Sequence, residues 1–130
     1  MFIHNLTPSQ QSIFLGMAIE LIEIDGQVDD REFSLVEELK SLCSVESEPV
    51  KITSNDDLAT LFLDQKSRVS LLLELISIAC VDENYDEKEK NYISQVAGMI
   101  KVPEVLLEDL ESWAQRQMTL MQEAIIFMEN

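Results

Sequence analysis

The chain is poor in the residues that interrupt helices. Its 130 residues include only three glycines and three prolines, and this scarcity favours helical structure. No segment shows the period-two alternation of an amphipathic strand. We therefore predict an all-α fold, a compact helical bundle, in one domain spanning residues 1–130, since this length suits one domain with a substantial core.

Residues that carry common catalytic chemistry are equally scarce. His4 is the only histidine, and it lies in an N-terminal start that we expect to lack fixed structure. No helix pairs two histidines, and no Gly-rich phosphate loop occurs. These absences favour a protein that is not an enzyme.

Two cysteines, Cys43 and Cys80, lie inside apolar helical patterns and form no CxxC pair. We interpret them as reduced core thiols of a cytoplasmic protein. The first residues lack the basic and apolar segments of a signal peptide. The longest apolar stretch, 69–81, contains Glu74 and is too short to span a bilayer, so we predict a buried central helix and no membrane insertion.

Basic residues are few, with nine Lys and Arg against 25 Asp and Glu, a net charge of −16. Such a charge repels phosphate backbones and anionic lipid heads. We therefore expect no direct binding of nucleic acid. Cations and a protein partner with a basic surface remain as binding partners.

One acidic phrase is present twice, as Asp-Gly-Gln-Val-Asp-Asp-Arg-Glu at 25–32 and as Asp-Glu-Asn-Tyr-Asp-Glu-Lys-Glu at 82–89. An apolar helical stretch precedes and follows each copy, so the unit is helix, acidic turn, helix. We predict two pseudo-repeated αα-hairpins, at about 8–43 and 67–101, and a long C-terminal helical segment at 103–128. The pattern leaves open a break at 115–119.

Several helix boundaries can be predicted from capping residues. Thr7, Pro8 and Gln10 form the start of the first helix, with a capping box. The second helix is predicted from about Asp30 to Leu42, with Leu42 or Cys43 facing inward beside other apolar residues, Phe33, Val36 and Leu39. Residues 44–55 are predicted as a loop.

A second set of boundaries follows this loop. A short helix is predicted to carry Leu58, Leu61 and Phe62, and Asp64 or Ser67 to cap a central helix that ends near Asp82.

Capping accounts for part of the repeated phrase. Asp29 and Asp86 stand at N-cap positions, and Glu32 and Glu89 follow three residues later, the spacing of a capping box. Capping does not account for Asp25 and Asp82, which come at the C-terminal ends of helices. There the helix dipole disfavours a carboxylate by roughly 0.3–1 kcal/mol.

A bound cation would offset that cost. We predict a divalent cation site in each turn, and because all candidate ligands are oxygens, Ca²⁺ or Mg²⁺ is expected. The predicted ligands are Asp25, Asp29, Glu32, Asp82, Asp86 and Glu89.

The turns are not EF-hand loops. In the second copy the sixth position is Glu87 instead of Gly, and the twelfth is Ile93 instead of Glu. The first copy has Gln27 third and Val36 twelfth, which also breaks the pattern.

The duplicated unit, an aliphatic helix ending in Asp-Gly, then Val, an acidic residue and Glu32, resembles the tellurite-resistance TerB-like family. The resemblance covers about Leu15 to Ile100. It implies a helical bundle, divalent cations at paired acidic turns, and a role as an interaction module in stress-response or envelope-associated assemblies. The family's acidic positions fall on the six residues named above, and Glu83 replaces the turn glycine in the second copy.

Three functional hypotheses follow. The first is a cation-responsive, TerB-like protein-interaction module. The second is a plain helical adaptor whose repeated acids only cap helices, and the third is an acidic mimic of nucleic acid that occupies a basic protein groove. For the apolar anchor of a partner, or of a homodimer, the candidates are Trp113, Met118, Met121 and Phe127, which could instead close the bundle.

Overall fold

The computed structural model describes residues 2–24, 30–44, 48–50, 58–80 and 85–129, leaving out the side chains of 31–33, 35 and 36. These residues contain no strand, and the all-α prediction is confirmed. Their elements are η1 (Ile3–Asn5, a 3-10 helix), α1 (Pro8–Glu23), α2 (Asp30–Leu42), α3 (Leu58–Leu61), α4 (Gln65–Ala79), α5 (Glu87–Met99) and α6 (Glu104–Met128).

Local capping chemistry sets two of the helix starts. At α1 the Thr7 hydroxyl accepts the Gln10 N–H, and the Gln10 side chain accepts the Thr7 N–H, which completes the predicted capping box. At α4 the Asp64 carboxylate accepts the Ser67 N–H at 2.8 Å, so Asp64 is the cap. Helix α2 has the predicted bounds.

The residues predicted to face the core at the end of α2 and in α3 are buried in part. Cys43, not Leu42, faces the core, since Leu42 is 46% exposed. Leu58 and Phe62 are buried, whereas Leu61 is exposed.

The structure decides one open question about the helices and corrects one predicted helix end. The C-terminal segment has no break at 115–119 and runs as one helix of 25 residues. Helix α6 contains no proline or glycine after Pro103 at its N-cap, so no such residue interrupts its backbone hydrogen bonds. The central helix ends at Ala79, where Cys80 caps it, and not at Asp82.

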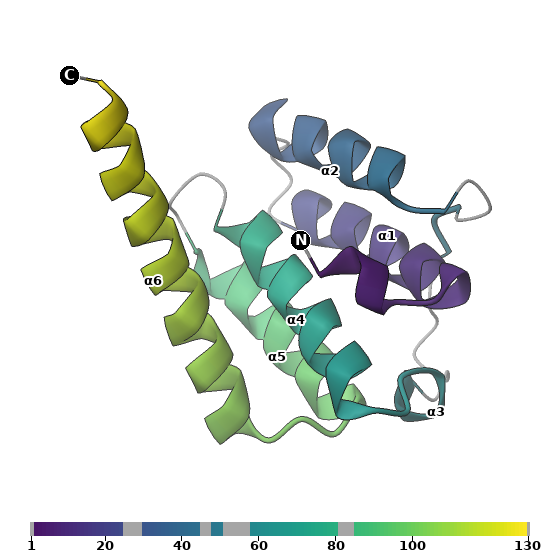
Figure 1. The fold of residues 1–130 in the computed structure, drawn as a ribbon. Helices are drawn as coiled ribbons and strands as arrows, with labels where there is room; N and C mark the ends of the chain where they lie inside the picture. Colours follow the sequence, from purple (N-terminus) through teal and green to yellow (C-terminus); the bar gives the residue numbers. More distant parts are fainter. Residues whose placement is uncertain (1, 25–29, 45–47, 51–57, 81–84, 130) are drawn as a thin grey trace.

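Helix α4 is the centre of the bundle. It contacts η1, α1, α2, α5 and α6, and Figure 1 shows it between the α1–α2 pair and α6. Its apolar side chains point in all directions, a pattern typical of a helix enclosed on every side. The fully buried ones are Leu71, Leu72, Leu75, Ile76 and Ile78.

The first residues of the chain pack onto α4. The Phe2 N–H donates to the Glu74 carboxylate at 2.7 Å, and the Asn5 side chain donates to the Ser70 hydroxyl at 3.0 Å. Ile3 is fully buried. The expectation of an unstructured start around His4 was therefore wrong, because a buried carboxylate requires hydrogen-bond donors and the N-terminus supplies one.

A close backbone contact joins α1 to the segment 48–50. The Val50 N–H donates to the Ser12 carbonyl at 3.0 Å, and Gly16 lies directly beneath the Val50 carbonyl. A Cβ at Gly16 would overlap that oxygen, whereas one at Gly98 in α5 would meet open space. Only glycine permits this approach of the two backbones.

We predict opposite effects for the same substitution at these glycines. Gly16→Ala should lower the free energy of unfolding by about 1–3 kcal/mol, because the 48–50 backbone must shift. Gly98→Ala should leave it unchanged or raise it by up to about 1 kcal/mol, as alanine favours a helix. Urea denaturation measures both, and a Gly16→Ala protein as stable as the parent would contradict the close contact.

Candidate functional site

Two of the six predicted ligands lie within the described side chains, Asp86 and Glu89. Asp25, Asp29 and Asp82 lie outside the described residues, and so does the side chain of Glu32. Among the side chains that are described, no three His, Cys, Asp or Glu residues come together as a metal site. The convergence of the six carboxylates therefore stays a prediction.

Asp86 is the N-cap of α5. Its Oδ1 atom accepts the Lys88 N–H at 2.6 Å and the Glu89 N–H at 3.3 Å, and its backbone is extended, as an N-cap requires. The capping prediction is confirmed at this position. Both hydrogen bonds use the same oxygen, so capping engages one of the two carboxylate oxygens.

Glu89 lies in the first turn of α5 and is buried, with 6% of its surface exposed. Tyr85, just before the helix, is close to it and to Glu111 of α6. Burial raises the pKa of Tyr85, and the Glu111 carboxylate raises this pKa further, with smaller contributions from Cys80 and Glu89. The phenol thus stays protonated and neutral among these acidic groups.

Glu111 is a buried acid that sequence reasoning missed. Its Oε2 atom and the Tyr85 hydroxyl are buried, and within the described part of the chain neither has a hydrogen-bond partner of good geometry. Its position could have drawn notice, because it shares the buried face of α6 with Leu107, Leu110 and Ala114. An acid in an apolar stripe is the informative exception.

A polar cleft of about 240 Å³ separates α5 from α6. Four carboxylates line it, beside Lys90 and neutral residues: Glu87, Glu104, Glu108 and Glu111. Four of the 25 acidic residues therefore gather where these two helices meet, close in sequence to the second acidic turn.

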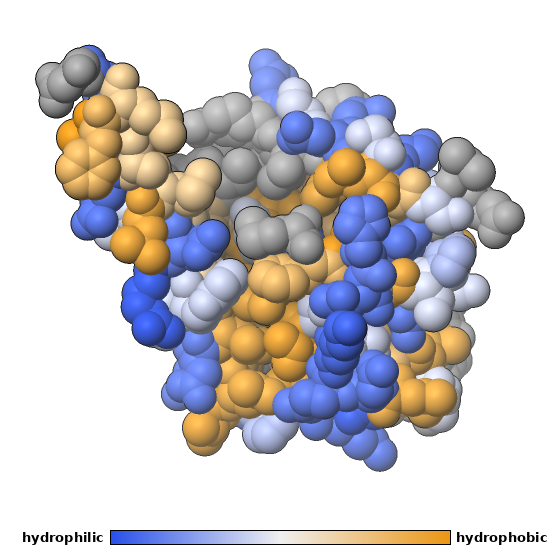
Figure 2. Space-filling view, viewed as in Figure 1, coloured by the Kyte–Doolittle hydropathy of each residue, from blue (hydrophilic) through white to orange (hydrophobic). Residues whose placement is uncertain are grey.

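The other distinctive surface is the C-terminal half of α6. This half stands apart from the bundle in Figure 1, and apolar side chains gather on it in Figure 2. Six large apolar residues there are each at least half exposed: Leu120, Met121, Ile125, Ile126, Phe127 and Met128.

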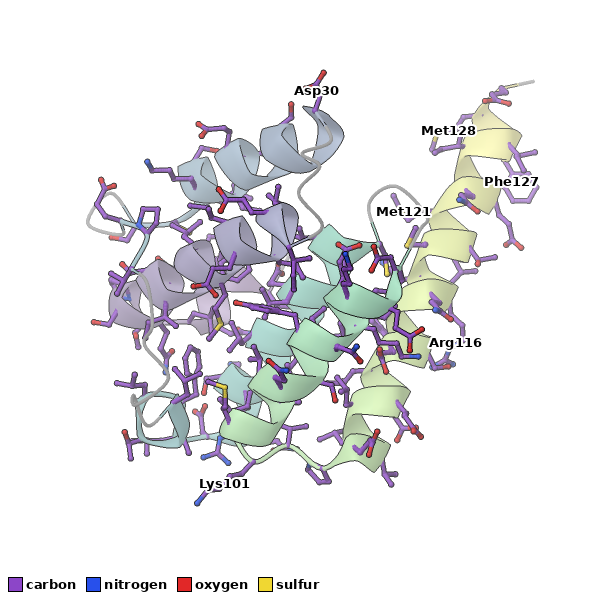
Figure 3. The ribbon with its side chains drawn as sticks, turned by 180° about the vertical axis from the view of Figure 1, so that it is seen from behind. Asp30, Lys101, Arg116, Met121, Phe127 and Met128 are labelled. Atoms are coloured by element: carbon purple, nitrogen blue, oxygen red, sulfur yellow. The ribbon has the colours of Figure 1, made fainter. Side chains whose placement is uncertain are left out.

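The four candidate anchor residues fall into two pairs. Met118 packs partly against the core, and Trp113, 37% exposed, makes an edge contact with the Phe2 ring at 5.9 Å between centroids. Met121 and Phe127 are exposed. In Figure 3 Met121 points to the bundle side of the helix and Phe127 points away from it.

The bundle side of this helix borders a groove of about 320 Å³. Ser77 of α4 and Cys80, the residue that caps this helix, form one wall, and seven residues of α6 from Trp113 to Ile125 form the other. None of the described residues that line it is charged. A smaller hollow of about 260 Å³ beside Tyr85 shares Cys80, Met118 and Gln122 with this groove.

Comparison with known proteins gives one family. Residues 51–112 match the family described as Tellurite resistance protein TerB. This segment of 62 residues, slightly less than half of the chain, is similar to that family. The TerB match includes α3, α4, α5 and the start of α6, and with them the second acidic turn and Glu111. It does not reach the first turn, although the resemblance drawn from the sequence did.

No curated protein and no solved structure matches the chain. Within the described parts of the chain, none of the helices combines the length and the apolar character that a bilayer span requires.

We predict that the Asp86 cap stabilises the fold without a cation. In buffer containing a chelator, Asp86→Ala should lower the free energy of unfolding by about 0.5–2 kcal/mol, because two N–H groups of α5 lose their acceptor. Asp86→Asn should retain most of that stability, since an amide oxygen can also cap. Equal losses in the two variants, measured by thermal or urea unfolding, would contradict a capping role.

Proposed function

We propose that this protein is a non-enzymatic, TerB-like interaction module that binds a protein partner with a basic surface. The observation that carries the proposal is the exposed apolar half of α6, which continues beyond the bundle. Contiguous exposed apolar surface is a mark of interaction sites. The net charge of −16 adds attraction toward a basic surface, because opposite charge steers encounter and selects partners.

The proposal includes divalent cation binding, Ca²⁺ or Mg²⁺, at the acidic turns. Two observations support this part. The phrase recurs with carboxylates at matching positions, and the cap at Asp86 engages only one carboxylate oxygen, Oδ1. Hard cations of this kind take carboxylate oxygens that bind through one or both atoms.

We also propose a stress-response role in the cytoplasm. Its support is the description of the matched family, tellurite resistance, together with two buried cysteines that are free thiols. Free thiols are the usual state in a reducing compartment.

Cation binding should raise the melting temperature. A ligand that binds only the folded state adds RT ln(1 + [L]/Kd), about 2.7 kcal/mol at a hundredfold excess over Kd. Millimolar Ca²⁺ or Mg²⁺ should therefore stabilise the protein more than NaCl of the same ionic strength. An equal rise of the melting temperature in NaCl would show that the salts act by screening the net charge and not by binding at a site.

The same titration has matched variants. Without a cation, Asp25→Asn and Asp82→Asn should be neutral or slightly stabilising, because each removes a charge disfavoured at a helix end. With a cation present, both should weaken binding. Asp109→Asn, which removes an exposed charge from α6, should bind as the parent does. If all three variants titrate alike, the turns act only as caps and the plain adaptor hypothesis is favoured.

Truncation tests the role of α6. The buried residues of α6 all lie at or before Ala114, so a chain ending after Gln117 should still unfold cooperatively, with a loss of no more than about 1 kcal/mol. Circular dichroism during heating measures this. Loss of the cooperative transition would assign the segment to the core and remove the main support for an interaction site.

A further inference from the structure

The bundle-facing stripe of α6 is buried in the first part of the helix and exposed in the last part. Along this stripe Leu107, Leu110 and Ala114 are buried, whereas Met121 and Ile125 are 57% and 51% exposed. The difference arises from length, since α4 has 15 residues and α6 has 25. The groove described above lies where α4 ends, and its apolar wall on α6 stays exposed beyond that point.

The apolar lining of the groove suits a helix. An amphipathic helix binds by placing side chains spaced at i, i+3, i+4 and i+7 into an apolar groove. The wall supplies two methionines, Met118 and Met121, whose flexible thioether chains adapt to different neighbours. Trp113 and Ile125 lie at its ends.

Charge distinguishes a foreign helix from a second copy of this chain. Two copies would bring together net charges of −16 each. In α6 itself five carboxylates face a single basic residue, Arg116, and the acidic cleft with α5 lies along the same helix. Screening over about 8 Å at physiological salt leaves close like charges unfavourable. A helix with Lys and Arg on its polar face would instead be attracted.

We infer that the groove between the end of α4 and the C-terminal half of α6 binds a basic amphipathic helix of a partner protein. Apolar side chains of that helix enter the groove between Cys80 and Met121, and its basic residues are attracted by the carboxylates of α6 and of the cleft with α5. This inference rests on the proposed function and adds the chemistry of the partner and the location of its binding site.

A synthetic peptide can test the inference with the full chain. The peptide has about 18 residues, enough for a helix, with Leu at i, i+3, i+4 and i+7 positions and Lys elsewhere. Trp113 is the only tryptophan and lines the groove, so its fluorescence reports occupancy. Saturable binding is expected, and a peptide with Glu in place of every Lys should bind at least about tenfold more weakly.

A pair of variants with the same charge change locates the site. Met121→Lys should weaken binding of the Leu/Lys peptide at least about tenfold, because a charge enters the apolar groove. Val105→Lys should stay within about threefold of the parent, since Val105 is 72% exposed on the same helix but does not line the groove. Equal affinities of the two variants would overturn the groove as the site.

Three further outcomes separate this inference from the proposed function. If Phe127→Lys abolishes peptide binding and Met121→Lys does not, the module stands but its outer face is the site. If sedimentation shows a dimer that Met121→Lys dissociates, a second copy occupies the groove and the basic partner is wrong. If no peptide binds and the chain ending after Gln117 loses cooperative unfolding, the proposed function fails as well.

Discussion

The burial of α4 on every side is the constraint on which the rest of the structure depends. A helix whose apolar residues point in all directions must be enclosed by other elements, and α1, α2, α5, α6 and η1 provide the enclosure. The constraint also explains the N-terminus. Glu74 lies within this helix, a buried carboxylate must be hydrogen-bonded, and the Phe2 N–H meets that need. Burial and the same carboxylate raise the pKa of Cys43, which keeps this thiol protonated and inert.

Helix α6 is longer than α4, against which it packs, so part of α6 extends past the end of α4. The proposed binding surface is this extending part. The first half of α6 contributes to the core, while the second half carries apolar residues of similar size without neighbours to cover them. Two kinds of surface, one acidic and one apolar, thus lie on different parts of α6. Carboxylates gather at its start, in the cleft with α5, and exposed apolar side chains gather at its end. In the proposed interaction, attraction over distance and affinity on contact would therefore come from different turns of α6.

Sequence reasoning predicted what depends on local chemistry. The capping box at Thr7, the caps at Asp64 and Asp86 and the bounds of α2 follow from short-range hydrogen bonds. It missed what depends on tertiary contacts, namely the packing of Ile3 onto α4 and the burial of Glu111, and it left open whether Leu42 or Cys43 faces the core. The same apolar periodicity describes a helix face that is covered and one that is not, so the sequence alone could not tell which half of α6 is exposed.

The contact between the Phe2 and Trp113 rings joins the first described residue to the middle of α6. Phe2 is held to α4 through its N–H, and Trp113 forms a wall of the groove. By thermodynamic linkage, a ligand that shifts Trp113 changes the stability of the docked N-terminus, and loosening the N-terminus changes affinity at the groove by the same factor. Protection of the first residues from proteases or from hydrogen exchange would then report whether the groove is occupied, although Phe2 and Trp113 are some hundred residues apart in the sequence.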